Sequence, residues 1–149
     1  MSKNELLLKV LSQKEYRILN LAADRIIPHH AENSPDLAAR IDRTLAGVRH
    51  EMSGEFKLLL QVFEFAAPLL GGGFKFFTRM GPAEQDRYLC CWQTSPLAFK
   101  RMGFQALKRA ILAAYYGSKS GGDSVGYQGP WLERGYPHDY EGKGIQHPR

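Results

Sequence analysis

The sequence is poor in cysteine and has no long apolar run. These two absences argue against a disulfide-stabilised secreted domain and against a transmembrane protein. Its 149 residues include two cysteines, the adjacent Cys90 and Cys91, which cannot build the disulfide framework of a small secreted domain. No run of about 18 apolar residues occurs, so we expect no transmembrane helix. The first residues contain neither a twin arginine nor the apolar core of a signal peptide. We therefore expect a cytoplasmic chain with reduced thiols, one of them buried and the other partly exposed.

The motifs of common metal and catalytic sites are also missing. The chain has no CxxC, HExxH or CxxCH pattern, and His29-His30 lacks the supporting ligands of a zinc site. Gly71-Gly72-Gly73 is not followed by the Gly-Lys-Ser/Thr of a phosphate-binding loop, and is typical of a helix stop. No Ser-His-Asp or Cys-His set and no acid–base pair of carboxylates can be nominated from spacing. The sequence therefore predicts no catalytic, cofactor-binding or metal-binding residue of its own.

The chain is basic, with a net charge of +5 and an isoelectric point of about 9.3. The segment after Gly117 is neutral, so the excess positive charge lies in the part before it. A basic nucleic-acid-binding helical domain is one alternative, and a steep dependence of affinity on salt would be its signature. However, the basic side of the last predicted helix lacks the interleaved aromatic residues of a single-strand binder. We favour a solvated face or one that meets an acidic protein, and expect no nucleic-acid ligand.

Helical periodicity and capping signals predict the first two helices. Ser12 and Glu15 have the spacing of a capping box, and apolar residues then recur at helical spacing until Pro28. A second helix is expected to begin at Ser34-Pro35-Asp36, with the serine as N-cap and the proline in the first turn.

Three further helices are predicted after these. The third runs from Ser53 or Gly54 to about Leu69, and its broad apolar stripe suggests a central place in the core. A short aromatic connector or helical turn at residues 74–77 precedes the fourth helix, which opens at Gly81-Pro82. The fifth spans residues 96–116, with Phe99 on its buried side, and Gly117 is expected as a left-handed cap. The prediction is an all-α fold: about five helices in a small bundle over residues 1–117.

Residues 118–149 form an irregular arm in this prediction, rich in glycine and aromatic residues. A disordered tail normally lacks large apolar rings, yet this one has Tyr127, Trp131, Tyr136 and Tyr140. Tyrosine and tryptophan are common interface anchors, and Gly126, Gly129 and Pro130 would let the backbone turn tightly against another surface. We expect the arm to dock on a partner; the alternative is that it folds back onto its own helices.

Two blocks of residues resemble the small subunit of gluconate 2-dehydrogenase, the subunit 3 family. The first is Leu21-Ala-Ala-Asp-Arg-Ile-Ile-Pro28. The second combines Tyr88-Leu89, Trp92, Ser95-Pro96, Phe104, Ala106-Leu107-Lys108, Tyr115-Tyr116-Gly117, Gly126-Tyr127 and Gly129-Pro130-Trp131. This second block also resembles the helical segment of long-chain alcohol oxidases of the glucose–methanol–choline class. Together the two blocks cover about residues 15 to 131.

The resemblance implies a non-catalytic accessory subunit that supports the assembly and stability of a large FAD-containing oxidoreductase subunit. FAD is expected in that partner and no cofactor on this chain, with a cytochrome subunit or another acceptor receiving the electrons. Because the twin-arginine signal of many family members is missing, we expect a complex in the cytoplasm or at the inner face of the membrane. The alternative is that the chain contributes residues to the partner's active site or electron-transfer interface. The predicted partner-interface residues are Asp24, Arg25, Pro28, Tyr115, Tyr116, Gly126, Tyr127, Gly129, Pro130, Trp131 and Tyr136.

Overall fold

The computed structural model describes residues 8–27, 36–70 and 75–126, and most of these residues are helical. No β-strand occurs among them, which confirms the predicted all-α bundle. The elements in chain order are α1 (Gln13–Ile26), α2 (Leu37–Leu45), α3 (His50–Leu70), the 3-10 turn η1 (Phe77–Arg79), α4 (Pro82–Gln93), α5 (Ala98–Tyr116) and α6 (Lys119–Ser124).

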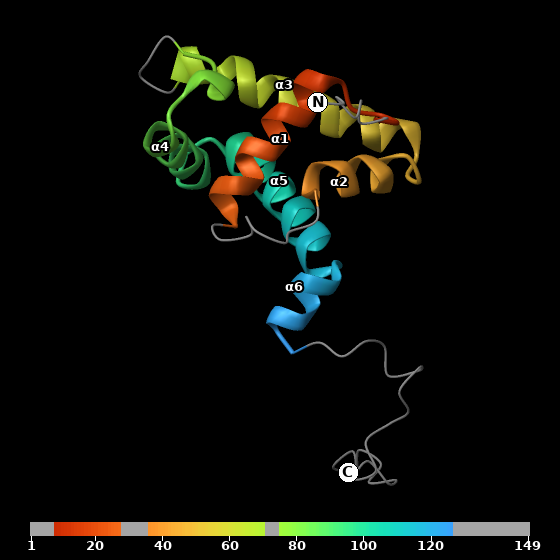
Figure 1. Ribbon diagram of the computed structural model, residues 1–149. Helices are drawn as coiled ribbons and strands as arrows, with labels where there is room; N and C mark the ends of the chain where they lie inside the picture. The colour runs from red at the N-terminus through yellow and green to blue at the C-terminus, as the bar shows by residue number, and fades with distance from the viewer. Residues whose placement is uncertain (1–7, 28–35, 71–74, 127–149) are drawn as a thin grey trace, which may run out of the picture.

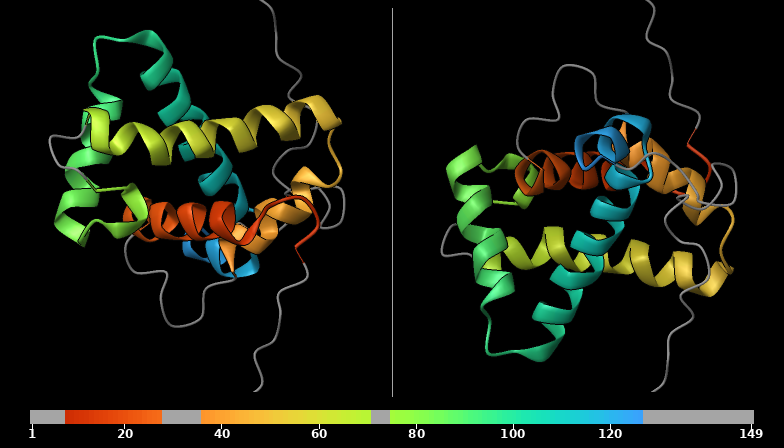
Figure 2. Two further views of the ribbon diagram at one scale, coloured as in Figure 1. Left: turned by 90° about the horizontal axis from the view of Figure 1, so that it is seen from above. Right: turned by 90° about the horizontal axis from the view of Figure 1, so that it is seen from below.

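Helix α5 runs through the middle of the molecule (Figure 1) and packs against α1, α2, α4 and α6. Helix α3 crosses one end of the bundle, and α6 lies at the opposite end (Figure 1). The view from above shows α1 and α3 side by side on one face (Figure 2, left), and the two helices are in contact. The expectation that the third helix is central is therefore wrong, because α3 leaves its outer side uncovered.

The first helix starts as its capping signal predicts. The N–H of Glu15 donates to Oγ of Ser12 at 3.3 Å, and the N–H of Ser12 donates to Oε2 of Glu15 at 2.8 Å. These reciprocal bonds satisfy two N–H groups that the first helical turn would otherwise leave unpaired. The helix ends at Ile26, two residues before Pro28.

The second and third helices start at other residues than predicted. Helix α2 is capped by Asp36, whose Oδ1 accepts the N–H of Ala39 at 2.9 Å, so the predicted start at Ser34-Pro35 is wrong. Helix α3 begins at His50, earlier than the predicted Ser53. The Ser53 hydroxyl donates to the carbonyl of His50 at 2.8 Å inside the first turn, so Ser53 is not the N-cap.

Helix α4 opens after Gly81 as predicted, with the Gly81 N–H donating to Oε2 of Glu84 at 2.8 Å. The side that it buries carries Gln85, Tyr88, Leu89 and Trp92, a spacing of three and four residues typical of one helix face. Cys90 and Cys91 fall outside this stripe and both are exposed. The prediction of one buried and one partly exposed thiol is therefore wrong.

The end of α5 differs from the predicted cap. Gly117 has φ −75° and ψ −5°, a right-handed conformation, and the chain continues into α6. The predicted left-handed cap at Gly117 is therefore wrong, and Lys119–Ser124, which the prediction includes in the irregular arm, form helix α6. Helix α5 itself begins at Ala98 and not at Pro96.

An aromatic cluster holds α3, η1 and α4 together. The Phe63 ring meets the rings of Phe77, Tyr88 and Trp92 edge to face, at centroid distances of 4.7, 5.0 and 4.9 Å. The Tyr88 hydroxyl donates to the carbonyl of Phe63 at 2.7 Å, so the polar end of this buried ring is satisfied. Phe77 is fully buried and opens the turn η1, which confirms that this end of the predicted aromatic connector packs on the bundle; the turn itself lies at Phe77–Arg79, later than the predicted residues 74–77.

Candidate partner-docking site

Two of the predicted interface residues, Asp24 and Arg25, lie near the end of α1 and are half-buried. The Nε of Arg25 donates to Oδ1 of Asp86 on α4 at 2.8 Å, so Arg25 ties α1 to α4. Solvent-accessible ion pairs of this kind contribute about 0–1 kcal/mol to stability. The role of the two residues toward a partner stays a prediction.

Tyr115 and Tyr116 are the last two residues of α5. Tyr115 is half-buried and packs against the hydrophobic core, whereas Tyr116 is 47% exposed. Their rings meet edge to face with centroids 5.2 Å apart. Of the two predicted residues, Tyr116 is therefore the one whose ring is open to a ligand.

The turn from α5 to α6 is fixed by close contacts. The Ser118 hydroxyl donates to the carbonyl of Tyr115 at 2.5 Å and accepts the N–H of Gly121 at 3.1 Å. A Cβ on Gly121 would clash with the backbone carbonyl of Tyr115, so no larger residue fits without a backbone shift. Nη2 of Arg40 on α2 donates to the carbonyl of Gly117 at 2.8 Å. These contacts set the direction in which α6 leaves the bundle.

Gly126 is the last described residue and has φ +70°, the left-handed region that favours glycine. The other predicted interface residues lie outside the described part of the chain, so nothing in the structure bears on them. These are Pro28, Tyr127, Gly129, Pro130, Trp131 and Tyr136.

The structure adds a surface that the sequence interpretation missed. Leu58, Val62 and Phe65 recur every three or four residues along the outer side of α3, and they are 60%, 40% and 60% exposed. Phe65 continues this stripe to Phe76, whose ring centroid lies 5.7 Å away. We call these four residues the α3 stripe. The sequence carries a signal for this stripe, because α3 has apolar residues on two of its sides. A helix at the periphery of a bundle can bury only one side, so the other remains exposed.

A groove lies beside the α3 stripe, between α3 and the segment made of residues 9–18. It consists of two separate hollows of about 560 and 640 Å³, and Gln61 lines both. Phe65 lines the first hollow and Leu58 the second, so the stripe forms part of the groove wall. We call this feature the α1–α3 groove. It has the size of a typical ligand pocket, but it is open along one side of the molecule.

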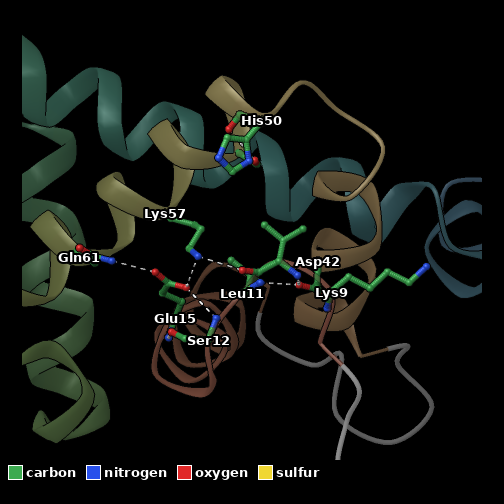
Figure 3. A network of polar contacts seen from close by, with 10 residues as sticks. Lys9, Leu11, Ser12, Glu15, Asp42, His50, Lys57 and Gln61 are labelled. Carbon is green, nitrogen blue, oxygen red and sulfur yellow. Dashed lines mark hydrogen bonds and ion pairs between the residues drawn. The ribbon is translucent and has the colours of Figure 1, made fainter.

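Polar contacts of buried Glu15 join the two walls of the groove (Figure 3). Nε2 of Gln61 donates to Oε1 of Glu15 at 3.0 Å, and Nζ of Lys57 lies 3.8 Å from Oε2. Burial alone would raise the pKa of Glu15, but the bonds from Ser12 and Gln61 and the charge of Lys57 outweigh it. The net result is a pKa below its usual value, so this carboxylate is ionised at neutral pH.

Asp42 of α2 holds the wall that precedes α1. Its Oδ2 accepts the N–H of Lys9 at 2.7 Å, and its Oδ1 accepts those of Val10 and Leu11 at 2.9 and 2.8 Å. The same segment is tied to α3, because Nζ of Lys57 donates to the carbonyl of Val10 at 3.1 Å. Burial raises the pKa of Asp42, but the three N–H donors outweigh this effect and hold the pKa below its usual value.

A second exposed apolar cluster lies where α4 joins α5. It contains Leu97, Phe99 and Met102, of which Met102 is 70% exposed. The prediction that Phe99 is buried is wrong: the buried residues of α5 are Lys100, Phe104, Leu107 and Ile111. Consecutive helical residues point about 100° apart, so with Lys100 turned inward Phe99 faces solvent.

Within residues 8–27, 36–70 and 75–126, no group of three or more His, Cys, Asp or Glu side chains is arranged to hold a metal ion. None of the helices in these ranges combines the length and apolar character that crossing a bilayer requires.

Comparison of the chain with protein-family models, curated proteins and solved structures finds no match.

Proposed function

We propose that this chain is a non-catalytic accessory subunit of an FAD-dependent oxidoreductase of the glucose–methanol–choline class, and that it supports assembly and stability of the large flavoprotein subunit. The observation that carries the docking role is the α3 stripe, a row of large apolar side chains left open on a folded bundle. Contiguous exposed apolar residues next to polar ones mark interaction sites. The kind of partner is proposed from the resemblance of the two sequence blocks.

The proposed complex has two contact regions on this chain. One is the α3 stripe with the α1–α3 groove, and the other is the arm that follows α6. Figure 1 shows α3 and α6 at opposite ends of the bundle. A partner that binds both would hold the small subunit at two separated points, which suits a subunit whose role is to stabilise a larger one. In this proposal FAD belongs to the partner, and we propose the cytoplasm or the inner membrane face as the location of the complex.

The test is affinity purification of the tagged full-length chain from its native host, followed by an absorption spectrum of the eluate. We expect one large protein in stoichiometric amount, with the visible absorption of a bound flavin. Substrate-dependent reduction of that flavin would then identify the alcohol or sugar that the complex oxidises. A folded, colourless chain without a partner would contradict the proposal, and salt-sensitive recovery of nucleic acid would support the basic-domain alternative.

A further inference from the structure

The α1–α3 groove is lined by more positive than negative charge. Five basic side chains line it, Lys9, Lys14, Arg17, Lys57 and Arg79, against two carboxylates, Glu15 and Glu64. Both carboxylates are already engaged. Glu15 accepts the bonds described above, and Glu64 accepts the N–H and hydroxyl of Thr78 at 3.0 and 2.6 Å.

Lys57 is engaged by Glu15 and by the carbonyl of Val10, whereas the other basic side chains of the groove are less committed. Lys14 and Arg17 are exposed, and within the described residues neither forms an ion pair. Arg79 lies over the Phe76 ring, with its guanidinium carbon 5.8 Å from the ring centroid. A ligand in the groove therefore meets cationic groups from α1 and η1 together with the apolar residues of the α3 stripe.

The shape of this surface suits a helix. Helices α1 and α3 lie side by side (Figure 2, left), and the furrow between two such helices can receive the side chains of a third. Helices that bind in grooves use apolar anchors spaced three and four residues apart. The exposed residues of the α3 stripe have the same spacing, so the apolar anchors of a bound helix could contact them one by one.

From this arrangement we propose that the α1–α3 groove binds an amphipathic helix of the partner subunit, with apolar residues on one face and Asp or Glu along its edge. The proposal rests on the proposed function, because it assumes a partner subunit. Lys14 and Arg17 select the acidic edge, and Leu58 and Phe65 contact the apolar face. The charge of the groove disfavours basic segments, including those of a second copy of this chain.

The test uses two synthetic helical peptides of about 18 residues, or about five turns. Both carry the same leucine face, and their flanking positions are either glutamate or lysine. Fluorescence anisotropy measures their binding to the full-length chain. We expect the acidic peptide to bind and the basic one not to bind. Arg17→Glu should weaken binding about ten-fold, whereas Arg109→Glu, the same charge change on an exposed face of α5, should leave it near the parent value.

Four results would overturn the proposal. The first is that the acidic peptide does not bind at low salt. The second is that Arg17→Glu and Arg109→Glu weaken binding equally, which would show that only the net charge of the chain matters. Self-association that is lost in Arg17→Glu would show that a second copy occupies the groove. A photo-crosslinker placed at position 65 that captures residues 127–149 of the same chain would show that the arm occupies it.

Co-purification separates this proposal from the proposed function. If the parent chain and the Arg17→Glu variant recover the same amount of flavoprotein, the partner does not use the groove, and the accessory role stands without it. If the parent recovers no flavoprotein, the accessory role fails, and the groove assignment fails with it because no partner helix exists. Unchanged circular dichroism and urea unfolding of Arg17→Glu ensure that lost binding reflects the groove.

Discussion

Replacing Asp42 with alanine should lower the free energy of unfolding by about 3–5 kcal/mol, because one carboxylate holds three consecutive backbone N–H groups just before α1. Asp42 is 2% exposed and accepts three backbone N–H groups from three consecutive residues. Alanine would remove all three bonds at once. The N–H groups of Lys9, Val10 and Leu11 would then need water or another acceptor.

The magnitude follows from the number of bonds and from what replaces them. A hydrogen bond to a charged group contributes about 1.5–3 kcal/mol, so three independent bonds would give roughly 4.5–9 kcal/mol. The true loss is smaller, because Lys9 and Val10 lie near the surface and water can reach their N–H groups after the change. Asp42→Asn should cost about 1.5–3 kcal/mol, since its carbonyl can keep the two bonds of Oδ1 but its NH₂ cannot accept the N–H of Lys9.

Urea unfolding at neutral pH, followed by circular dichroism, measures these differences. The expected order of stability is parent, then Asp42→Asn, then Asp42→Ala. The asparagine variant keeps the test decisive if the alanine variant does not fold, because total stabilities of single domains are only about 5–15 kcal/mol. An alanine variant within about 0.5 kcal/mol of the parent would refute the argument that this carboxylate holds the segment.

The same carboxylate predicts a dependence on pH. The folded-state pKa of Asp42 is lowered, so its contribution is complete above the unfolded pKa of about 4 and is lost as pH falls through the folded value. Glu15 has a lowered pKa as well and adds to the same acid-sensitive window. In Asp42→Asn the loss of stability below about pH 5 should be shallower than in the parent. An identical pH profile would show that Asp42 does not titrate differently in the folded state.

Three further predictions can be tested on single variants. Phe63→Ala should destabilise the fold by about 3–5 kcal/mol in urea unfolding, because it opens the aromatic cluster. Phe65→Ala should cost less than about 0.5 kcal/mol, because this side chain is exposed, and it should weaken peptide binding in the groove as measured by anisotropy. Gly121→Ala should destabilise the fold by about 1–3 kcal/mol, because the new Cβ clashes with backbone. Gly54→Ala should stabilise α3 by up to about 1 kcal/mol, because its Cβ meets no atom within 4 Å. Variants that melt at the same temperature as the parent would contradict both predictions. Trp131→Ala should weaken the complex with the flavoprotein by about 2–4 kcal/mol without unfolding the chain, as measured by titration calorimetry, and unchanged affinity would remove it as an anchor.

Local signals predicted the parts of the fold that depend on neighbouring residues. The capping box of Ser12 and Glu15 sets the start of α1, and Gly81-Pro82 sets the start of α4; both depend on contacts within four residues. The same kind of local signal predicts a start of α2 at Ser34, which is wrong because the cap is two residues later. Asp36 caps the helix and also accepts the Tyr16 hydroxyl at 2.5 Å, a pairing that links α2 to α1 across 20 residues.

The candidate site was harder to predict, because it depends on which helix faces lie uncovered. Periodicity shows that α3 has an apolar face, but it does not show that Leu58 and Phe65 remain outside after the first face is buried. The role of Asp42 also depends on tertiary structure, because its carboxylate oxygens accept N–H groups from residues more than 30 positions earlier in the chain. The position of Arg25 near the end of the first predicted helix and the sequence resemblance suggest a partner contact, whereas its bond to Asp86 depends on the packing of α1 on α4.

A double-mutant cycle can determine whether the groove and the arm act as separate contacts. Helix α6, which the arm follows in the sequence, lies at the end of the bundle opposite α3 (Figure 1), so we expect Arg17 and Trp131 to contact different parts of the partner. Distant sites without shared contacts usually give additive effects within about 0.5 kcal/mol. We therefore expect the affinity loss of the Arg17→Glu, Trp131→Ala double variant to equal the sum of the two single losses. A double variant markedly less damaged than that sum would place the arm and the groove at one contact, because removing either residue would then have already broken the same interaction.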